Sequence, residues 1–115
     1  LCHMLKRLRQ DVDGARSLTL RGGPEGEVLL IESDGEPIRY EIREQRVIRR
    51  AGPEQSSWTT SGGTIKCRIW AQAGEPIALE VRTCVSTSRD ALRKEKLVRT
   101  HVLFLGGLRR RSPGR

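Results

Sequence analysis

The chain has 115 residues and a formal net charge of +8, with 22 Lys and Arg residues against 14 Asp and Glu. This length is typical of a single domain and excludes large enzyme scaffolds such as an eight-stranded α/β barrel. Ile, Leu, Val and Phe make up 28 of the 115 residues, which is enough for a mainly aliphatic core. No run approaches the roughly 18 consecutive apolar residues of a bilayer-spanning helix.

Much of the positive charge is concentrated at the C-terminal end. Four of the arginines lie in the last seven positions, and without them the net charge is +4. Together with Ser112, Pro113 and Gly114 they predict a basic disordered tail over 109–115. Many of the remaining Lys and Arg residues alternate with apolar ones, which favours a solvated sheet face over a nucleic-acid patch. The chain's four aromatic residues also argue against stacking on single-stranded bases.

Residues 1–16 are predicted to form an amphipathic helix. Apolar residues follow helical spacing, and polar residues occupy the other face; the apolar stripe consists of Leu1, Met4, Leu5, Leu8, Val12 and Ala15. The stripe begins at the first residue without a polar N-cap. We therefore expect the continuation of a longer helix, and the alternative is a short helix whose leader or tag is not included.

Residues 17–50 are predicted to form a three-stranded antiparallel meander. Asp34-Gly35 is a strong hairpin signal between two apolar strands. A two-residue turn there sets Leu29 opposite Tyr40 and Ile31 opposite Ile38, with apolar side chains matched on one face. A third strand follows over 46–50, and the turn-forming residues of 51–60 predict a loop that holds Trp58.

Residues 63–105 are predicted to form a second set of strands. A turn at Gly74-Glu75-Pro76 sets Cys67 opposite Thr83 and Ile69 opposite Val81. A Cys67–Cys84 bridge needs a one-residue slip that loses the apolar match, so we expect no disulfide there unless a bulge intervenes. Residues 86–96 are either a short capped helix or a hairpin loop. The last strand spans 97–105, with Val98, Val102 and Phe104 on one face and His101 pointing outward.

The sequence contains no recognisable catalytic or ligand-binding motif. Neither histidine has a carboxylate or cysteine at metal-ligand spacing, and the nucleophile elbow, phosphate loop and dinucleotide fingerprint are absent. We therefore expect no enzyme activity, no cofactor and no metal. Trp70 lies on the charged face of its strand, where it either anchors an interface or packs beneath the N-terminal helix.

Residues 5–20, with the apolar strands at 28–31, 38–42 and 46–50, resemble prepilin-like proteins and the minor pseudopilins of type II secretion. The resemblance covers residues 4–50 well and 63–105 only in architecture. It implies an α+β, pilin-like fold in which an N-terminal helix packs on an antiparallel meander, as one domain over 1–108. The leader and long apolar helix of such proteins are not among these 115 residues.

The resemblance implies a non-enzymatic structural subunit of a type II secretion or type IV pilus-like assembly. A preceding apolar helix would anchor it in the bacterial inner membrane, with the globular domain in the periplasm. Its partners would be other pilin-like subunits, not a small-molecule substrate or a specific nucleic acid. The expected contact residues are Leu1, Met4, Leu5, Leu8, Trp58 and Trp70.

The alternative hypothesis is a basic, β-rich module that binds nucleic acid or another polyanion. Its contacts would come from basic residues in both sets of strands, namely Arg39, Arg43, Arg46, Arg49, Arg50, Lys66 and Arg68. Such binding would weaken steeply with salt, because it depends on counterion release.

Overall fold

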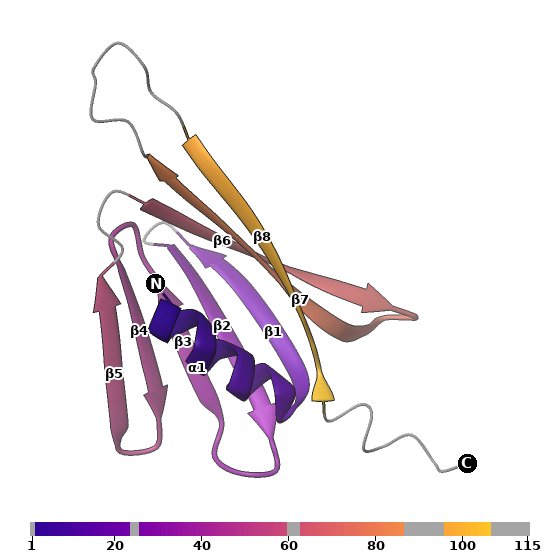
Figure 1. The fold of residues 1–115 in the computed structure, drawn as a ribbon. Helices are drawn as coiled ribbons and strands as arrows, with labels where there is room; N and C mark the ends of the chain where they lie inside the picture. The colour runs from indigo at the N-terminus through magenta and orange to yellow at the C-terminus, as the bar shows by residue number, and fades with distance from the viewer. Residues whose placement is uncertain (1, 24–25, 60–62, 87–95, 107–115) are drawn as a thin grey trace.

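A computed structural model describes residues 2–23, 26–59, 63–86 and 96–106. Strands account for 71% of these residues, in two antiparallel sheets preceded by one helix (Figure 1). The elements are α1 (Cys2–Asp13), β1 (Ala15–Gly23), β2 (Gly26–Ser33), β3 (Ile38–Ile42), β4 (Arg46–Ala51), β5 (Glu54–Thr59), β6 (Gly63–Gln72), β7 (Glu75–Ser86) and β8 (Lys96–Phe104).

Sheet A is a five-stranded meander in the order β1-β2-β3-β4-β5. The register predicted for its central hairpin is confirmed, since Leu29 lies opposite Tyr40 and Ile31 opposite Ile38. The loop predicted over 51–60 is wrong, because residues 54–59 form β5 and pair with β4. Gly52 adopts a positive φ of 59° in the turn between these strands, so the turn formers make a tight hairpin and not an open loop.

Sheet B contains β6, β7 and β8 in that order. Cys67 lies opposite Val81 and Ile69 opposite Leu79, so the predicted register is wrong by two residues. Two features cause the difference: the turn is centred on Ala73 and Gly74, with φ values of 53° and 81°, and the register shifts by one residue between Trp70 and Ala71. A shift of two residues leaves every side chain on its predicted face.

Helix α1 and sheet B pack against the same face of sheet A (Figure 1). One continuous core joins them, because Met4, Leu8 and Val12 of the helix are buried together with residues of both sheets. From sheet A the core takes Leu18, Leu29, Ile31, Tyr40, Ile42 and Val47, and from sheet B it takes Cys67, Leu79, Val81 and Leu103. Among the described residues, no helix has the length and apolar character needed to span a bilayer.

The expectation of an α+β, pilin-like fold with a helix on a single meander is wrong. The chain is mostly β, with one short helix and two separate antiparallel sheets. Two local features raise the strand content above the expected one. Gly14 ends the helix, so that Ala15 begins β1, and residues 54–59 add a fifth strand to the first sheet. The segment 87–95 and the tail 109–115 lie outside the described residues.

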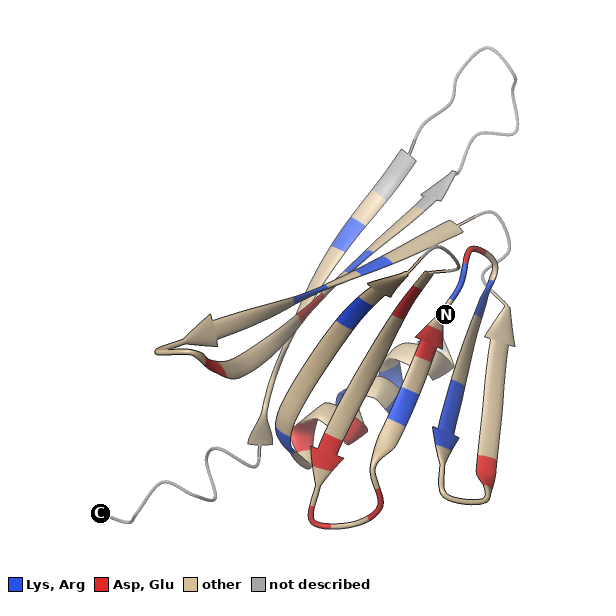
Figure 2. Cartoon of the chain, turned by 180° about the vertical axis from the view of Figure 1, so that it is seen from behind, with Lys and Arg blue, Asp and Glu red and all other residues tan. Residues whose placement is uncertain are grey.

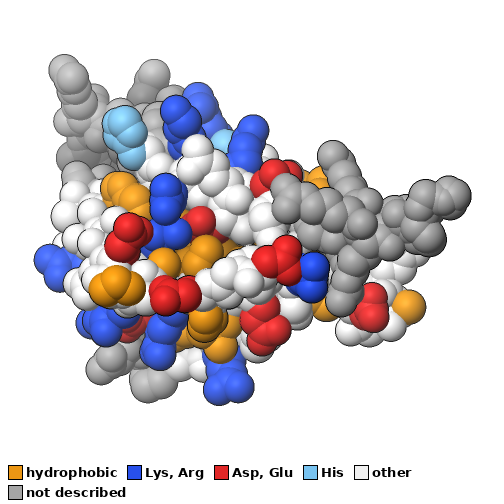
Figure 3. Space-filling view, turned by 90° about the horizontal axis from the view of Figure 1, so that it is seen from below, with side chains coloured by type: hydrophobic (Ala, Val, Ile, Leu, Met, Phe, Trp, Pro, Cys, Tyr) orange, Lys and Arg blue, Asp and Glu red, His pale blue; other side chains and the backbone are white. Residues whose placement is uncertain are grey.

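The strands of sheet A carry charged residues of both signs (Figure 2), and strand pairing puts Arg39, Glu41 and Arg50 on the face that points away from the helix. Glu41 lies among these charges and pairs with Arg43 and Arg50, each at 3.2 Å. Acidic residues also occur at the end of the sheet that holds the β2–β3 turn. Seen from that end, acidic side chains surround a group of apolar ones, with basic side chains around them (Figure 3).

Candidate functional site

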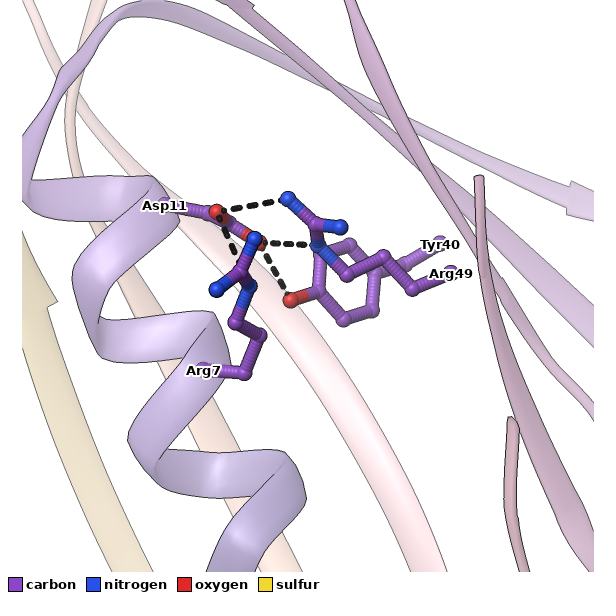
Figure 4. Close-up of polar contacts among 4 residues, drawn as sticks. All are labelled: Arg7, Asp11, Tyr40 and Arg49. Atoms are coloured by element: carbon purple, nitrogen blue, oxygen red, sulfur yellow. Dashed lines mark hydrogen bonds and ion pairs between the residues drawn. The ribbon is translucent and has the colours of Figure 1, made fainter. Parts of the chain in front are cut away.

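A buried network of polar side chains joins α1 to sheet A. The Asp11 carboxylate accepts hydrogen bonds from Tyr40 Oη at 2.5 Å and from Arg49 Nε at 2.8 Å and Nη2 at 3.1 Å (Figure 4). Arg7, one helical turn earlier, lies 4.0 Å from the same carboxylate and is half-exposed. Because Tyr40 and Arg49 are direct neighbours on β3 and β4, one helical carboxylate engages both strands.

The pKa shifts of Tyr40 and Arg49 keep the hydroxyl and the guanidinium protonated near neutral pH. Burial first, and then the hydrogen bond to Asp11, raises the pKa of Tyr40 far above its ordinary value of 10.0. The same carboxylate raises the pKa of Arg49 above its ordinary value, against the opposite effect of burial. Asp11, Tyr40 and Arg49 are at most 8% exposed. The network therefore fixes the helix on the sheet and is closed to a substrate.

A second feature is an exposed aromatic pair on the outer face of sheet B. Trp70 of β6 and Phe104 of β8 flank Ala78 of β7 in one row across the sheet. Their rings meet edge to face, with centroids 6.4 Å apart. Trp70 is 38% exposed and Phe104 52% exposed, whereas Ala78 is fully buried. The indole Nε1 of Trp70 also donates a hydrogen bond to Glu80 at 3.2 Å, so the ring is held in place.

Basic residues continue this surface along the same strands. Strand pairing puts Arg68, Glu80 and Val102 in the next row, and Lys66, Arg82 and Thr100 in the row after that. Glu80 lies 3.7 Å from Arg82, which neutralises one of the three cations. We call the surface formed by these three rows the aromatic–basic face. Aromatic side chains beside arginine are typical of protein contact sites.

The expected contact residues differ in how far the structure buries them. Met4 and Leu8 are only 1% and 2% exposed, because their side chains fill the core beneath the helix. Leu5 and Trp58 are partly buried against the same core. Trp70 does not pack beneath the helix, since it lies on the opposite face of β6 from Cys67 and Ile69, which face the core. Leu1 lies outside the described residues.

Sequence reasoning missed Phe104 as a contact residue. Its face of β8 was predicted to be apolar, with Val98 and Val102, but it is the outer face, where Val98 and Phe104 are each 52% exposed. The core-facing residue is Leu103, and His101 lies on that same face, opposite Val81. With the correct register of β7, the sequence would have placed Phe104 in the same row as Trp70, and this pairing of two aromatic residues could have identified Phe104 as a contact residue.

The basic residues of the alternative hypothesis do not form one surface. Arg49 is buried against Asp11, while Arg39 and Arg50 lie opposite each other on the outer face of sheet A. Lys66 and Arg68 belong to the outer face of the other sheet. A single polyanion cannot contact all of these residues at once.

The cavities in the described part of the chain are not lined by a cluster of reactive side chains. Two neighbouring cavities measure about 360 and 540 Å³ and share Glu27, whose carboxylate accepts the backbone N–H of Cys67 at 3.2 Å and so links the sheets. Burial first, and then Glu27, raises the pKa of the Cys67 thiol to about 12, so it stays protonated at neutral pH. Cys84 lies on the opposite face of sheet B, and both thiols are free. In the described part of the chain no cluster of His, Cys, Asp or Glu is arranged to hold a metal ion.

Comparison with protein-family models, with curated proteins and with solved structures finds no match to this chain.

Proposed function

We propose that this chain is a non-enzymatic structural subunit that works by protein–protein contact through the aromatic–basic face. The observation that carries the proposal is the Trp70–Phe104 pair. The two rings stand on β6 and β8, on either side of β7, and expose apolar surface to solvent. Burying such a pair against a partner is favourable, because aromatic side chains bring a large contact area at low cost in conformational entropy.

The position of this face in the fold supports the same proposal. The network of Asp11, Tyr40 and Arg49 fixes the helix, and the Glu27 hydrogen bond to Cys67 fixes the second sheet against the first. The chain therefore presents a preorganised surface, which lowers the entropic cost of association. The type II secretion or pilus-like setting, with anchoring in the inner membrane, is the assembly that we propose for the subunit; the resemblance of residues 4–50 supports it.

Site-specific photo-crosslinking tests this function. The full-length protein, produced in its own cells, would carry benzoylphenylalanine in place of Phe104, and a matched control would carry it in place of Thr19, on the outer face of sheet A. We expect position 104 to crosslink to subunits of a pilus-like or secretion assembly, and position 19 to do so much less. Equal crosslinking at both positions, or none to assembly subunits, would refute the proposal.

A further inference from the structure

We infer that the aromatic–basic face binds a second copy of this chain, through the acidic end of its β2–β3 hairpin. The inference deepens the proposed function, on which it rests, by naming the partner. The acidic tip consists of Glu32, Asp34 and Glu36, all exposed. It lies at one end of sheet A (Figure 2), whereas the aromatic–basic face belongs to sheet B.

The charges of the two surfaces are complementary. On the aromatic–basic face, Lys66, Arg68 and Arg82 outnumber the single acid, Glu80. On the tip, Asp34 pairs with Arg16 at 2.7 Å. Within the part of the chain that the structure describes, Glu32 and Glu36 form no ion pair. The tip therefore retains two carboxylates that can face the basic rows.

The tip also carries apolar surface. Residues 34–37 join β2 to β3, Pro37 is exposed beside Glu36, and the view from below shows apolar side chains next to the acidic ones (Figure 3). A proline ring can pack on the exposed face of Phe104 while the carboxylates meet Lys66 and Arg68. Because the outer face of sheet B points away from sheet A, the contact requires a second molecule.

A contact between two different surfaces is head-to-tail. In a pair of molecules joined in this way, one molecule keeps a free acidic tip and the other keeps a free aromatic–basic face. Repetition of such a contact forms an open chain or a ring, which is what a structural subunit needs. The footprint is small. Three rows of three residues, at about 4.8 Å between strands and about 6.8 Å between rows, cover roughly 300 Å². This is well below the roughly 800 Å² per partner of a stable complex, so the isolated domain should associate weakly and gain strength in an array.

Charge-reversal complementation tests the inference. One variant reverses the tip (Glu32→Lys with Glu36→Lys), and the other reverses the face (Lys66→Glu with Arg68→Glu). Sedimentation velocity of the wild-type protein into the hundreds of micromolar should show association that grows with concentration and weakens with salt. Each variant alone should associate at least about tenfold more weakly, because its own tip and face then carry like charges. An equimolar mixture should recover wild-type association, because tip and face are again complementary between the two variants.

Two controls make the outcome decisive. Arg21→Glu with Arg39→Glu changes the net charge as the face variant does, but on the outer face of sheet A, and should leave association unchanged. Circular dichroism checks that each variant is folded, and Phe104→Ser should weaken association without any change in charge. A wild-type protein that stays monomeric, or a mixture that does not recover, overturns the inference. Crosslinks from position 104 to a different subunit, with no self-association, would overturn it while leaving the proposed function standing.

Discussion

Removal of the Asp11 carboxylate by Asp11→Ala is expected to destabilise the fold far more than its single charge suggests. The substitution leaves the Arg49 guanidinium without its ionic partner, although the residue is only 4% exposed. It also takes the acceptor from the Tyr40 hydroxyl. Breaking a buried ion pair by removing one partner costs about 3–5 kcal/mol. That is a large share of the roughly 5–15 kcal/mol that stabilises a typical domain.

The matched control is Asp34→Ala. Asp34 pairs with Arg16 at 2.7 Å, as short as the contact between Asp11 and Arg49, but its side chain is 68% exposed. Exposed pairs contribute about 0–1 kcal/mol, so this variant should stay within about 1 kcal/mol of the wild-type protein. The comparison separates burial from distance as the cause of the stabilisation.

Urea unfolding followed by circular dichroism gives both free energies of unfolding. A triple variant supplies a further check, in which Leu replaces Asp11, Met replaces Arg49 and Phe replaces Tyr40. It should recover much of the loss, because no buried polar group is left without a partner. If Asp11→Ala costs no more than Asp34→Ala, the network does not fix the helix and the reasoning fails.

Two further predictions concern pH and backbone strain. Burial raises the pKa of Tyr40 above its ordinary value of 10.0, so its contribution to stability is complete below pH 10 and is lost as the pH rises beyond it. The stability difference between wild type and Tyr40→Phe, measured by urea unfolding, should therefore shrink by about 1.4 kcal/mol between about pH 9 and 11, and a constant difference would contradict the assigned burial. Gly26→Ala should cost at least about 2 kcal/mol, because Gly26 has a φ of 135° and a Cβ there would lie 2.1 Å from the Ile42 carbonyl oxygen. Gly22→Ala, where a Cβ meets nothing within 4 Å, should be nearly neutral in the same urea unfolding assay, and equal losses from the two variants would refute the strain.

Local features of the sequence were sufficient for the first half of sheet A. The Asp34-Gly35 signal predicted the register of its hairpin correctly, because a two-residue turn assumed there leaves only one pairing that matches Leu29 with Tyr40 on the apolar face, although residues 34–37 join the two strands in the structure. The same logic failed at the second hairpin. Gly74 was taken as the start of the turn, but Ala73 precedes it in a left-handed conformation that a non-glycine residue rarely adopts.

The amphipathic helix, the alternation of the strands and the pairing of β2 with β3 were thus determined by the sequence alone, since each depends on neighbours a few residues apart. Only the tertiary structure decided that the chain forms two sheets, that Asp11 meets Tyr40 and Arg49, and that Trp70 and Phe104 form an exposed pair. These contacts join residues 29, 38 and 34 positions apart. A period of two or of 3.6 residues states which side chains share a face, but it does not state which face another element covers.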